Sequence, residues 1–189
     1  MQHWAYKVKH QHSTQAKSVP ENATCVGHAV QRSVQAVHAN NRKADVGALT
    51  DQLLSATGLS SVKYSPLTEL EDAPEGAHLL RCVALACALA SDPVVLLIQE
   101  PFAEASPEQA TSLVALLRSL ANGGRTVVLG SEEGLDDAQY AAVDTCVLLS
   151  KGRAMYYGVA GEAVSWFAAQ GHAKPAGQAV ADFLVNLVR

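Results

Sequence analysis

The chain has 189 residues, of which 49% are hydrophobic and 17% are charged, and its formal net charge is −4 at pH 7. This balance is typical of a folded globular protein that is long enough for one domain with its own core. Because the chain is acidic and its Lys and Arg residues are not clustered, the sequence argues against a nucleic-acid partner.

The four cysteines show no Cys-x-x-Cys spacing. We interpret them as small buried hydrophobic side chains in a reducing compartment, in preference to a disulfide or a metal site; they are Cys25, Cys82, Cys87 and Cys146. The N-terminal stretch MQHWAYKVKHQH is polar and contains no apolar segment of the kind found in signal peptides. No apolar run approaches the roughly 20 residues of a membrane-spanning helix.

Residues 1–43 are rich in Gln, His, Asn and Ser and have weak periodicity. They predict a polar arm that is poorly ordered or weakly helical, with a short helix over 30–38. His3, His10 and His12 lie close together in this arm, but no further ligands of a suitable type follow, so an arm is favoured over a metal site.

The next part of the chain predicts two helices. Apolar residues at helical spacing indicate a helix over 45–57, which Gly58 is placed to end. Residues 59–70 are predicted as a loop, with Pro66 breaking any helix. A second helix is predicted over 76–90; it is apolar nearly all round and is therefore expected to be buried.

A β-α-β unit is predicted next. The apolar run 94–98 indicates a strand buried on both faces, as in a parallel sheet. Ser106 as N-cap, Pro107 in the first turn and Gln109 closing a capping box mark the start of a helix. A strand over 126–129 follows, so we expect the two strands to lie parallel.

Two further strands and two helices are predicted for the rest of the chain; they span 145–149, 154–157, 160–170 and 179–188. A tight turn over 150–153 joins the two strands, and Gly158 is expected to end the second. The first helix is expected to expose Trp166 and Phe167. The whole pattern predicts an α/β fold with a helical subdomain over 44–92, a sheet core over 93–158 and C-terminal helices over 159–189.

Several stretches, in the right order over about 45–189, resemble the ATP-binding domain of ABC transporters, and specifically its C-terminal part in the G (White-type) subfamily. They are VGALTDQLLSATGLS, SDPVVLLIQEP, SPEQATSLVALLRSLANGGRTVVLGS, VDTCVLLSKGRAMYYGVAGEAVSWFAAQG and VADFLVNLV. The resemblance implies a partial P-loop NTPase-type fold with a parallel sheet and flanking helices. It also implies ATP and Mg²⁺ as cofactors.

Glu100 stands where the family keeps the glutamate that activates the water attacking ATP. Gln99 replaces the aspartate that binds Mg²⁺ in the family, and a neutral amide is a poor substitute for a carboxylate toward a hard dication. Phosphoryl transfer relies on that ion to neutralise the developing charge. Glu100 is therefore the candidate catalytic residue, and Gln99 marks the magnesium position.

The resemblance assigns the other nucleotide-binding positions to residues that depart from the family pattern. Glu132, or Ser131 if the alignment shifts by one, stands at the switch histidine. Ser106 falls in the D-loop. The signature motif aligns with the run Glu75-Gly76-Ala77-His78-Leu79, so Gly76 and Ala77 fall in it. This run lacks the serine of the motif and has the bulky His78 in place of a glycine.

A phosphate-binding loop needs the pattern G-x-x-x-x-G-K-[ST], and no Gly-Lys pair occurs in this chain. The sequence therefore predicts a truncated ATP-binding domain of an ABC transporter that does not hydrolyse ATP alone. The resemblance implies a transmembrane domain and a second ATP-binding domain as partners, and a location at the cytoplasmic face of a membrane.

Two alternatives stay open. The chain is a non-catalytic interaction or regulatory module derived from the same domain, with Trp166, Phe167 and Phe183 as candidate contacts. Alternatively it is an unrelated α/β enzyme that uses Ser131, although the spacing around this serine is not that of a G-x-S-x-G nucleophile elbow.

Overall fold

The computed structural model of the protein describes residues 23–39, 41, 44–73, 75–132 and 135–188. The chain divides into two compact units. The helical unit contains the described residues up to Pro93 together with Phe102–Leu116, and the strand unit contains Val94–Pro101 and the residues from Leu117 onward. Each unit has its own elements and is described by itself.

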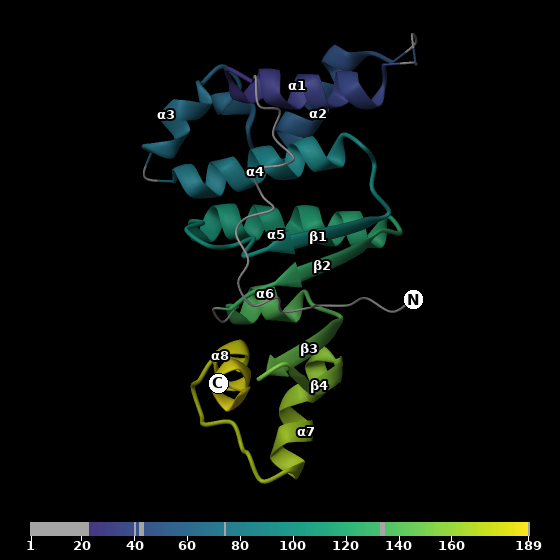
Figure 1. Ribbon diagram of the computed structural model, residues 1–189. Coiled ribbons are helices and arrows are strands. Elements are labelled where there is room, and N and C mark those ends of the chain that lie inside the picture. The colour runs from purple at the N-terminus through teal and green to yellow at the C-terminus, as the bar shows by residue number, and fades with distance from the viewer. Residues whose placement is uncertain (1–22, 40, 42–43, 74, 133–134, 189) are drawn as a thin grey trace. The chain divides into compact units, whose positions relative to one another are not determined.

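The helical unit is built from four α-helices and one short 3₁₀ helix in its described residues before Pro93 (Figure 1). They are α1 (Val26–Val37), α2 (Val46–Ala56), η2 (Ser60–Val62), α3 (Leu67–Glu71) and α4 (Gly76–Leu89). The core forms where apolar stripes of these helices meet. Its most buried side chains, at 0–1% exposure, include Val26, Val30, Val34, Leu54 and Val83.

The expected short helix over 30–38 is present and starts earlier, as α1 (Val26–Val37), but the expectation of a polar arm is wrong for residues 23–39. Val26, Val30 and Val34 recur every four residues, so they form one apolar stripe that packs into the same core as α2 and α4. This segment is a regular helix, and its polar residues lie on the other face. The three clustered histidines, His3, His10 and His12, lie outside the described residues.

The two predicted helices of this unit are confirmed. The Asp45 side chain caps α2 by accepting a hydrogen bond of 3.0 Å from the Ala48 N–H, and Gly58 follows the helix with φ of +74°. The helix α4 has no exposed residue. The predicted loop before it is partly wrong, because Pro66 is the N-cap of α3 and starts a short helix there.

The strand unit begins with the predicted β-α-β arrangement, which is confirmed. The strands β1 (Val95–Gln99) and β2 (Thr126–Gly130) pair in parallel, with Leu97 opposite Val128. The connecting helix α5 (Pro107–Asn122) contributes residues to both units. Its capping box is also confirmed, since the Ser106 hydroxyl accepts from the Gln109 N–H at 3.3 Å and the Gln109 side chain accepts from the Ser106 N–H at 2.9 Å.

The prediction that the first strand is buried on both faces is wrong. Leu96 is 5% exposed, whereas Val94, Val95 and Leu97 are 73%, 54% and 74% exposed. Among the described residues the parallel sheet consists of β1 and β2 alone. A strand of such a sheet is covered on one face only, so its continuous apolar run leaves half of its side chains in solvent.

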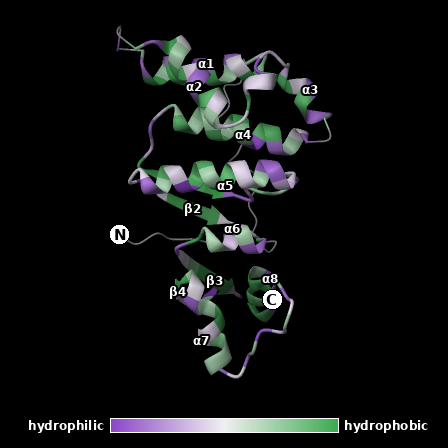
Figure 2. Ribbon diagram, turned by 180° about the vertical axis from the view of Figure 1, so that it is seen from behind, coloured by the Kyte–Doolittle hydropathy of each residue, from purple (hydrophilic) through white to green (hydrophobic). Residues whose placement is uncertain are grey.

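The rest of the strand unit is an antiparallel hairpin with helices; its elements are α6 (Asp137–Ala141), β3 (Thr145–Ser150), β4 (Arg153–Val159), η3 (Ala160–Glu162), α7 (Ala163–Ala169) and α8 (Val180–Val188). The helix α6 was not predicted. Gly158 does not end β4, because it pairs with Cys146 inside the ladder. The helix α8 is hydrophobic along most of its length (Figure 2) and packs into the core of this unit.

The aromatic residues expected to be exposed are mostly core residues. Phe167 and Phe183 are each 5% exposed, and Trp166 is 43% exposed. Trp166 contacts both Phe167 and Tyr156 edge-on, with ring centroids 4.9 and 5.5 Å apart. The expectation of exposed Phe167 and Phe183 is therefore wrong, because these two rings fill the space between the hairpin and its helices.

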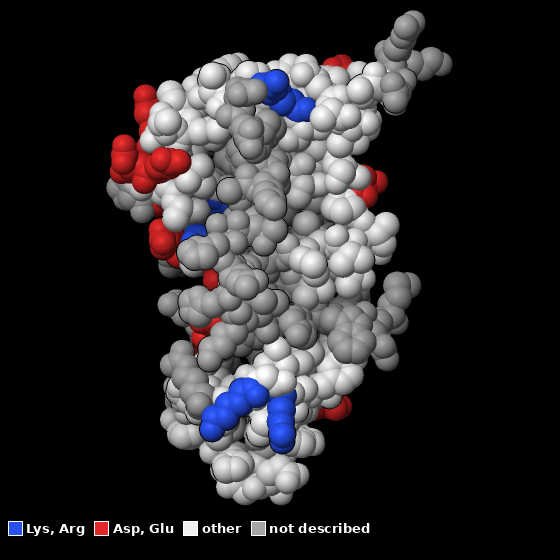
Figure 3. Space-filling model, in the orientation of Figure 1, with Lys and Arg blue, Asp and Glu red and all other residues white. Residues whose placement is uncertain are grey.

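The cysteines are all free thiols. Cys82, Cys87 and Cys146 are buried, as predicted, and burial raises the pKa of each thiol; Cys25 is half-buried. Within the described residues, no helix combines the length and apolar character needed to span a bilayer. On the face drawn in Figure 3, the described Lys and Arg side chains stand in small separate groups.

Candidate functional site

Glu100 lies directly after β1, at the carboxyl end of the parallel strand pair. Its backbone N–H donates a hydrogen bond of 2.7 Å to the Gly130 carbonyl, which extends the ladder by one residue. One oxygen of its carboxylate accepts from the Ser131 hydroxyl at 2.9 Å, and the other accepts from the backbone N–H of Glu132. The Glu100 carboxylate therefore lies against the end of the neighbouring strand β2.

The backbone of Glu100 has a φ of +46°, which costs a residue with a side chain about 1–2 kcal/mol. The hydrogen bonds with Gly130, Ser131 and Glu132 hold this conformation. Both carboxylate oxygens are therefore engaged by groups that follow β2. Sequence reasoning considered Ser131 as an alternative for the switch position and as the serine of an unrelated enzyme, and it did not foresee the bond to Glu100. The available signal was the place of Ser131 directly after the neighbouring strand.

Gln99 is the last residue of β1 and pairs in register with Gly130. Its side chain is a neutral amide, and the adjacent Glu100 carboxylate already accepts two hydrogen bonds. Within the described ranges, no group of three or more His, Cys, Asp or Glu side chains is arranged to hold a metal ion. Because Mg²⁺ prefers charged oxygen ligands, this donor set does not fit the ion that the resemblance implies.

Three of the other predicted positions, Gly76, Ala77 and Ser106, lie in the helical unit at or next to the starts of α4 and α5. Ser106 caps α5 together with Gln109, and the Gln109 side-chain amide donates to the carboxylate of Glu75. Glu75 is the N-cap of α4, and Gly76 is its first helical residue. The starts of α4 and α5 are thus joined through side chains, and Ser106 serves this cap.

Gly76 is required by packing. A Cβ atom at this position would lie 1.7 Å from the carbonyl oxygen of Leu70. Ala77 follows it in α4, and His78, which replaces a signature glycine, is 4% exposed and points into the core with Nε2 3.5 Å from the Cys82 thiol. Burial lowers the pKa of His78.

The predicted site residues therefore form two groups. Gln99, Glu100 and Glu132 lie in the strand unit, whereas Gly76, Ala77 and Ser106 lie in the helical unit. The structure brings Glu100 into contact with Glu132, and it links Ser106 to the start of α4 through Gln109 and Glu75. The assembly of both groups into one nucleotide site stays a prediction.

The parallel strand pair with its crossover helix, followed by a hairpin and preceded by a helical unit, is an α/β arrangement of the P-loop NTPase type found in ABC ATPases. The structure is similar to that of cbiO1 from Clostridium perfringens, part of the ABC transporter complex cbiONQ. The similarity has a TM-score of 0.59 at 22% sequence identity, and it covers 82% of this chain and 57% of that chain. The predicted fold class is confirmed by this likeness.

Curated relatives confirm the resemblance to the G subfamily. The chain is 35% identical over 96 residues to ABC transporter G family member 14 of Arabidopsis thaliana, covering 51% of this chain and 15% of that protein. It is 26% identical over 130 residues to the broad substrate specificity ATP-binding cassette transporter ABCG2 of Sus scrofa, covering 65% and 20%.

A third relative is protein white of Ceratitis capitata, with 30% identity over 106 residues, covering 56% of this chain and 16% of that protein. The chain thus spans a fifth or less of the length of these three relatives. No family model matches the chain. The partial matches fit a likeness to one part of the transporter, the C-terminal part of its ATP-binding domain.

Proposed function

We propose that this chain corresponds to the C-terminal part of an ATP-binding domain of the ABC-transporter kind, that it serves transmembrane transport and that it does not hydrolyse ATP alone. The names of its relatives and the fold of its structural neighbour support the transporter assignment. On this proposal the chain lies at the cytoplasmic face of a membrane. Its partners are a transmembrane domain and a second ATP-binding domain.

The single observation that carries the proposed inactivity is the state of the Glu100 carboxylate. Both of its oxygens accept hydrogen bonds, one from Ser131 and one from the backbone of Glu132. A carboxylate has about four lone-pair sites, so each Glu100 oxygen keeps acceptor capacity, but the two bonds fix the carboxylate against the end of β2 and restrict where a water can approach it. Since Gln99 also lacks the charge that Mg²⁺ requires, the site is poorly suited to activating water against a phosphate.

On this proposal the residues at the remaining motif positions have structural roles. Ser106 holds the start of α5, and Gly76 allows α4 to approach Leu70. Ala77 and the buried His78 continue α4 into the core. Under this reading an intact partner domain supplies the motifs that bind ATP and Mg²⁺, and these residues contribute the packing of their own helices.

The test is a steady-state ATPase assay of the purified full chain with Mg·ATP. We expect no turnover above the background set by a buffer blank and by the Glu100→Gln variant. Gln99→Asp is the matched change that restores the acidic ligand type, and it should not restore turnover, because the phosphate-binding loop pattern is absent from this sequence. A measurable rate that disappears in Glu100→Gln would overturn the proposed inactivity.

The second candidate function, a non-catalytic interaction module, is favoured by the exposed apolar face of β1. Val95 and Leu97 lie on this face and are each more than half exposed, which is costly in water and is typical of surfaces that meet a partner. Co-purification with an intact G-subfamily half-transporter tests this function. Leu97→Asp should abolish the capture, and loss of capture without loss of folding separates binding from stability.

A further inference from the structure

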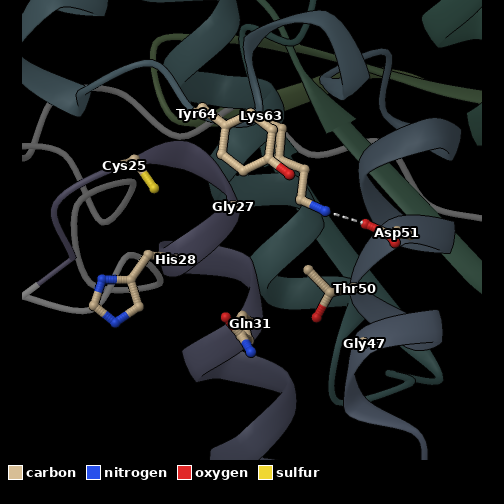
Figure 4. Close-up of a pocket in the computed structure, with 9 residues that line it drawn as sticks. All are labelled: Cys25, Gly27, His28, Gln31, Gly47, Thr50, Asp51, Lys63 and Tyr64. Carbon is tan, nitrogen blue, oxygen red and sulfur yellow. Dashed lines mark hydrogen bonds and ion pairs between the residues drawn. The ribbon is translucent and has the colours of Figure 1, made fainter.

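A cavity of about 210 Å³ lies in the helical unit between α1 and α2 (Figure 4). His28 and Gln31 line it from α1, Thr50 and Asp51 from α2, and Lys63 and Tyr64 from the segment after η2. Pockets for drug-sized ligands measure about 300–1,000 Å³. This cavity is smaller than that range, so its ligand must be small.

The charged groups of the cavity form one ion pair. The Lys63 ammonium lies 2.6 Å from one carboxylate oxygen of Asp51 and 5.4 Å from the centroid of the Tyr64 ring. The hydrogen bond that Lys63 donates to Asp51 is the largest cause that raises the pKa of Lys63, so the amine stays charged at neutral pH. An aromatic ring beside an ammonium adds a cation–π attraction.

Lys63 is held in place by its surroundings. The backbone N–H of Gly27 in α1 donates a hydrogen bond of 2.7 Å to the Lys63 carbonyl. The aliphatic stem of Lys63 crosses directly over Gly27, where a Cβ atom would lie 2.9 Å from Lys63 Cγ. Because Gly27 is buried and has no side chain, the lysine is positioned before any ligand arrives, which lowers the entropic cost of binding.

The paired charges select the kind of ligand. A lone anion at Lys63 meets the negative charge of Asp51, and a lone cation at Asp51 meets the positive charge of Lys63. A molecule that carries both charges avoids each repulsion. The ammonium has three N–H groups and the carboxylate has two oxygens, so each retains capacity beyond the bond that joins them. When a ligand with one positive and one negative charge binds beside the Lys63–Asp51 pair, each of its charges lies next to the opposite charge of the protein.

We propose that this cavity binds a free α-amino acid in its zwitterionic form. The ligand carboxylate accepts from Lys63, the ligand ammonium donates to Asp51, and the ligand side chain lies against the ring of Tyr64. Tyr64 is 82% exposed, so such a contact covers an aromatic surface that is now in solvent. His28 and Gln31 offer further polar groups at the wall. This inference is independent of the proposed transport role.

Isothermal titration calorimetry of the full chain with L-phenylalanine tests the ligand class. We expect saturable binding, and affinities lowered at least about tenfold for phenylalaninamide, which lacks the carboxylate, and for N-acetyl-L-phenylalanine, which lacks the ammonium. Equal affinity for either derivative overturns the zwitterion assignment. The absence of saturable binding at concentrations up to about 10 mM overturns the site altogether.

Variants then locate the binding. Lys63→Met and Asp51→Asn should each weaken phenylalanine binding at least about tenfold, because each leaves one charge of the ligand without its partner. Arg118→Met is the matched control, since it breaks a different ion pair, Arg118–Asp144 at 2.6 Å in the strand unit. Circular dichroism checks that all three variants are folded. Binding that survives in Lys63→Met and Asp51→Asn contradicts the proposal.

Discussion

The Ser131 hydroxyl donates a hydrogen bond of 2.9 Å to the carboxylate of Glu100, which joins the residue after β2 to the residue after β1. The backbone N–H of Glu132 donates to the other carboxylate oxygen. Hydrogen bonds to a charged acceptor are stronger than those between neutral groups. Glu100 therefore ties the ends of two neighbouring parallel strands together and stabilises its own left-handed backbone conformation.

Glu100→Ala should lower the free energy of unfolding by about 1–3 kcal/mol, because it leaves a hydroxyl and an amide without their acceptor. Ser131→Ala should lower it by about 1 kcal/mol, since it removes one of the two bonds. Urea denaturation of the purified chain measures both. Glu71→Ala, an exposed acidic residue at the end of α3, is the control and should stay within about 0.5 kcal/mol of the parent.

A double-mutant cycle separates the Glu100–Ser131 contact from other effects of the two changes. The double variant should be less destabilised than the sum of the single variants by at least about 0.5 kcal/mol, because the shared hydrogen bond is lost only once. Strict additivity would mean that the serine does not hold the carboxylate in solution, and the orientation of Glu100 against the end of β2 would then be wrong.

Gly76→Ala should destabilise the chain by at least about 1–3 kcal/mol, because the new methyl group overlaps the Leu70 carbonyl and forces α3 and α4 apart. Gly161→Ala is the matched control: a Cβ there meets no atom within 4 Å, and its backbone is not left-handed. Thermal denaturation followed by circular dichroism compares the two. Equal melting temperatures would show that the close approach of α3 and α4 is not a property of the folded protein.

The elements that could be predicted from the sequence are those with local signals. Asp45 and Gly58 bracket α2, and the Ser106–Gln109 capping box starts α5, because caps act within a few residues of the helix end. The parallel pairing of β1 and β2 followed from the crossover helix between them. The position of Glu100 at the end of the first strand followed from the same pattern.

The features that could not be predicted depend on contacts between distant residues. The side chains of Val95 and Leu97 are exposed because the described parallel sheet has only two strands. The number of strands in a sheet cannot be predicted from a single apolar run. The approach of Gly76 to Leu70 depends on how α3 and α4 cross. The bond between Ser131 and Glu100 joins two strand ends whose register only the folded sheet sets.

Lys151→Asn should stabilise the β3–β4 hairpin by about 0.5–1 kcal/mol. Lys151 and Gly152 have φ values of +49° and +77° between the paired residues Ser150 and Arg153, which is the geometry of a two-residue type I′ turn. Asparagine tolerates the left-handed region better than lysine does. Gly152→Ala should have the opposite effect, of about 1 kcal/mol. Urea denaturation measures the free energy of unfolding of both variants. If Lys151→Asn is no more stable than Gly152→Ala, this turn geometry is contradicted.

His78 should make the stability of the chain depend on pH. Its imidazole is 4% exposed, and its Nδ1 has no hydrogen-bond partner in the part of the chain that the structure describes. Burial is the main cause that lowers the pKa of His78 below 6.5 in the folded state, so the unfolded chain takes up the proton first. The stability is therefore fully present above pH 6.5 and decreases as the pH falls below it.

Urea denaturation of the parent chain and of His78→Leu between pH 7.5 and about pH 5 isolates this contribution, because the leucine fills a similar space and cannot titrate. We expect the parent to lose more free energy of unfolding than the variant as the pH falls through the unfolded-state value. His172→Leu is the matched control, since His172 is exposed, and it should follow the parent curve. If His78→Leu and the parent have parallel curves, His78 is not buried in its neutral form, and the packing of α4 into its core needs revision.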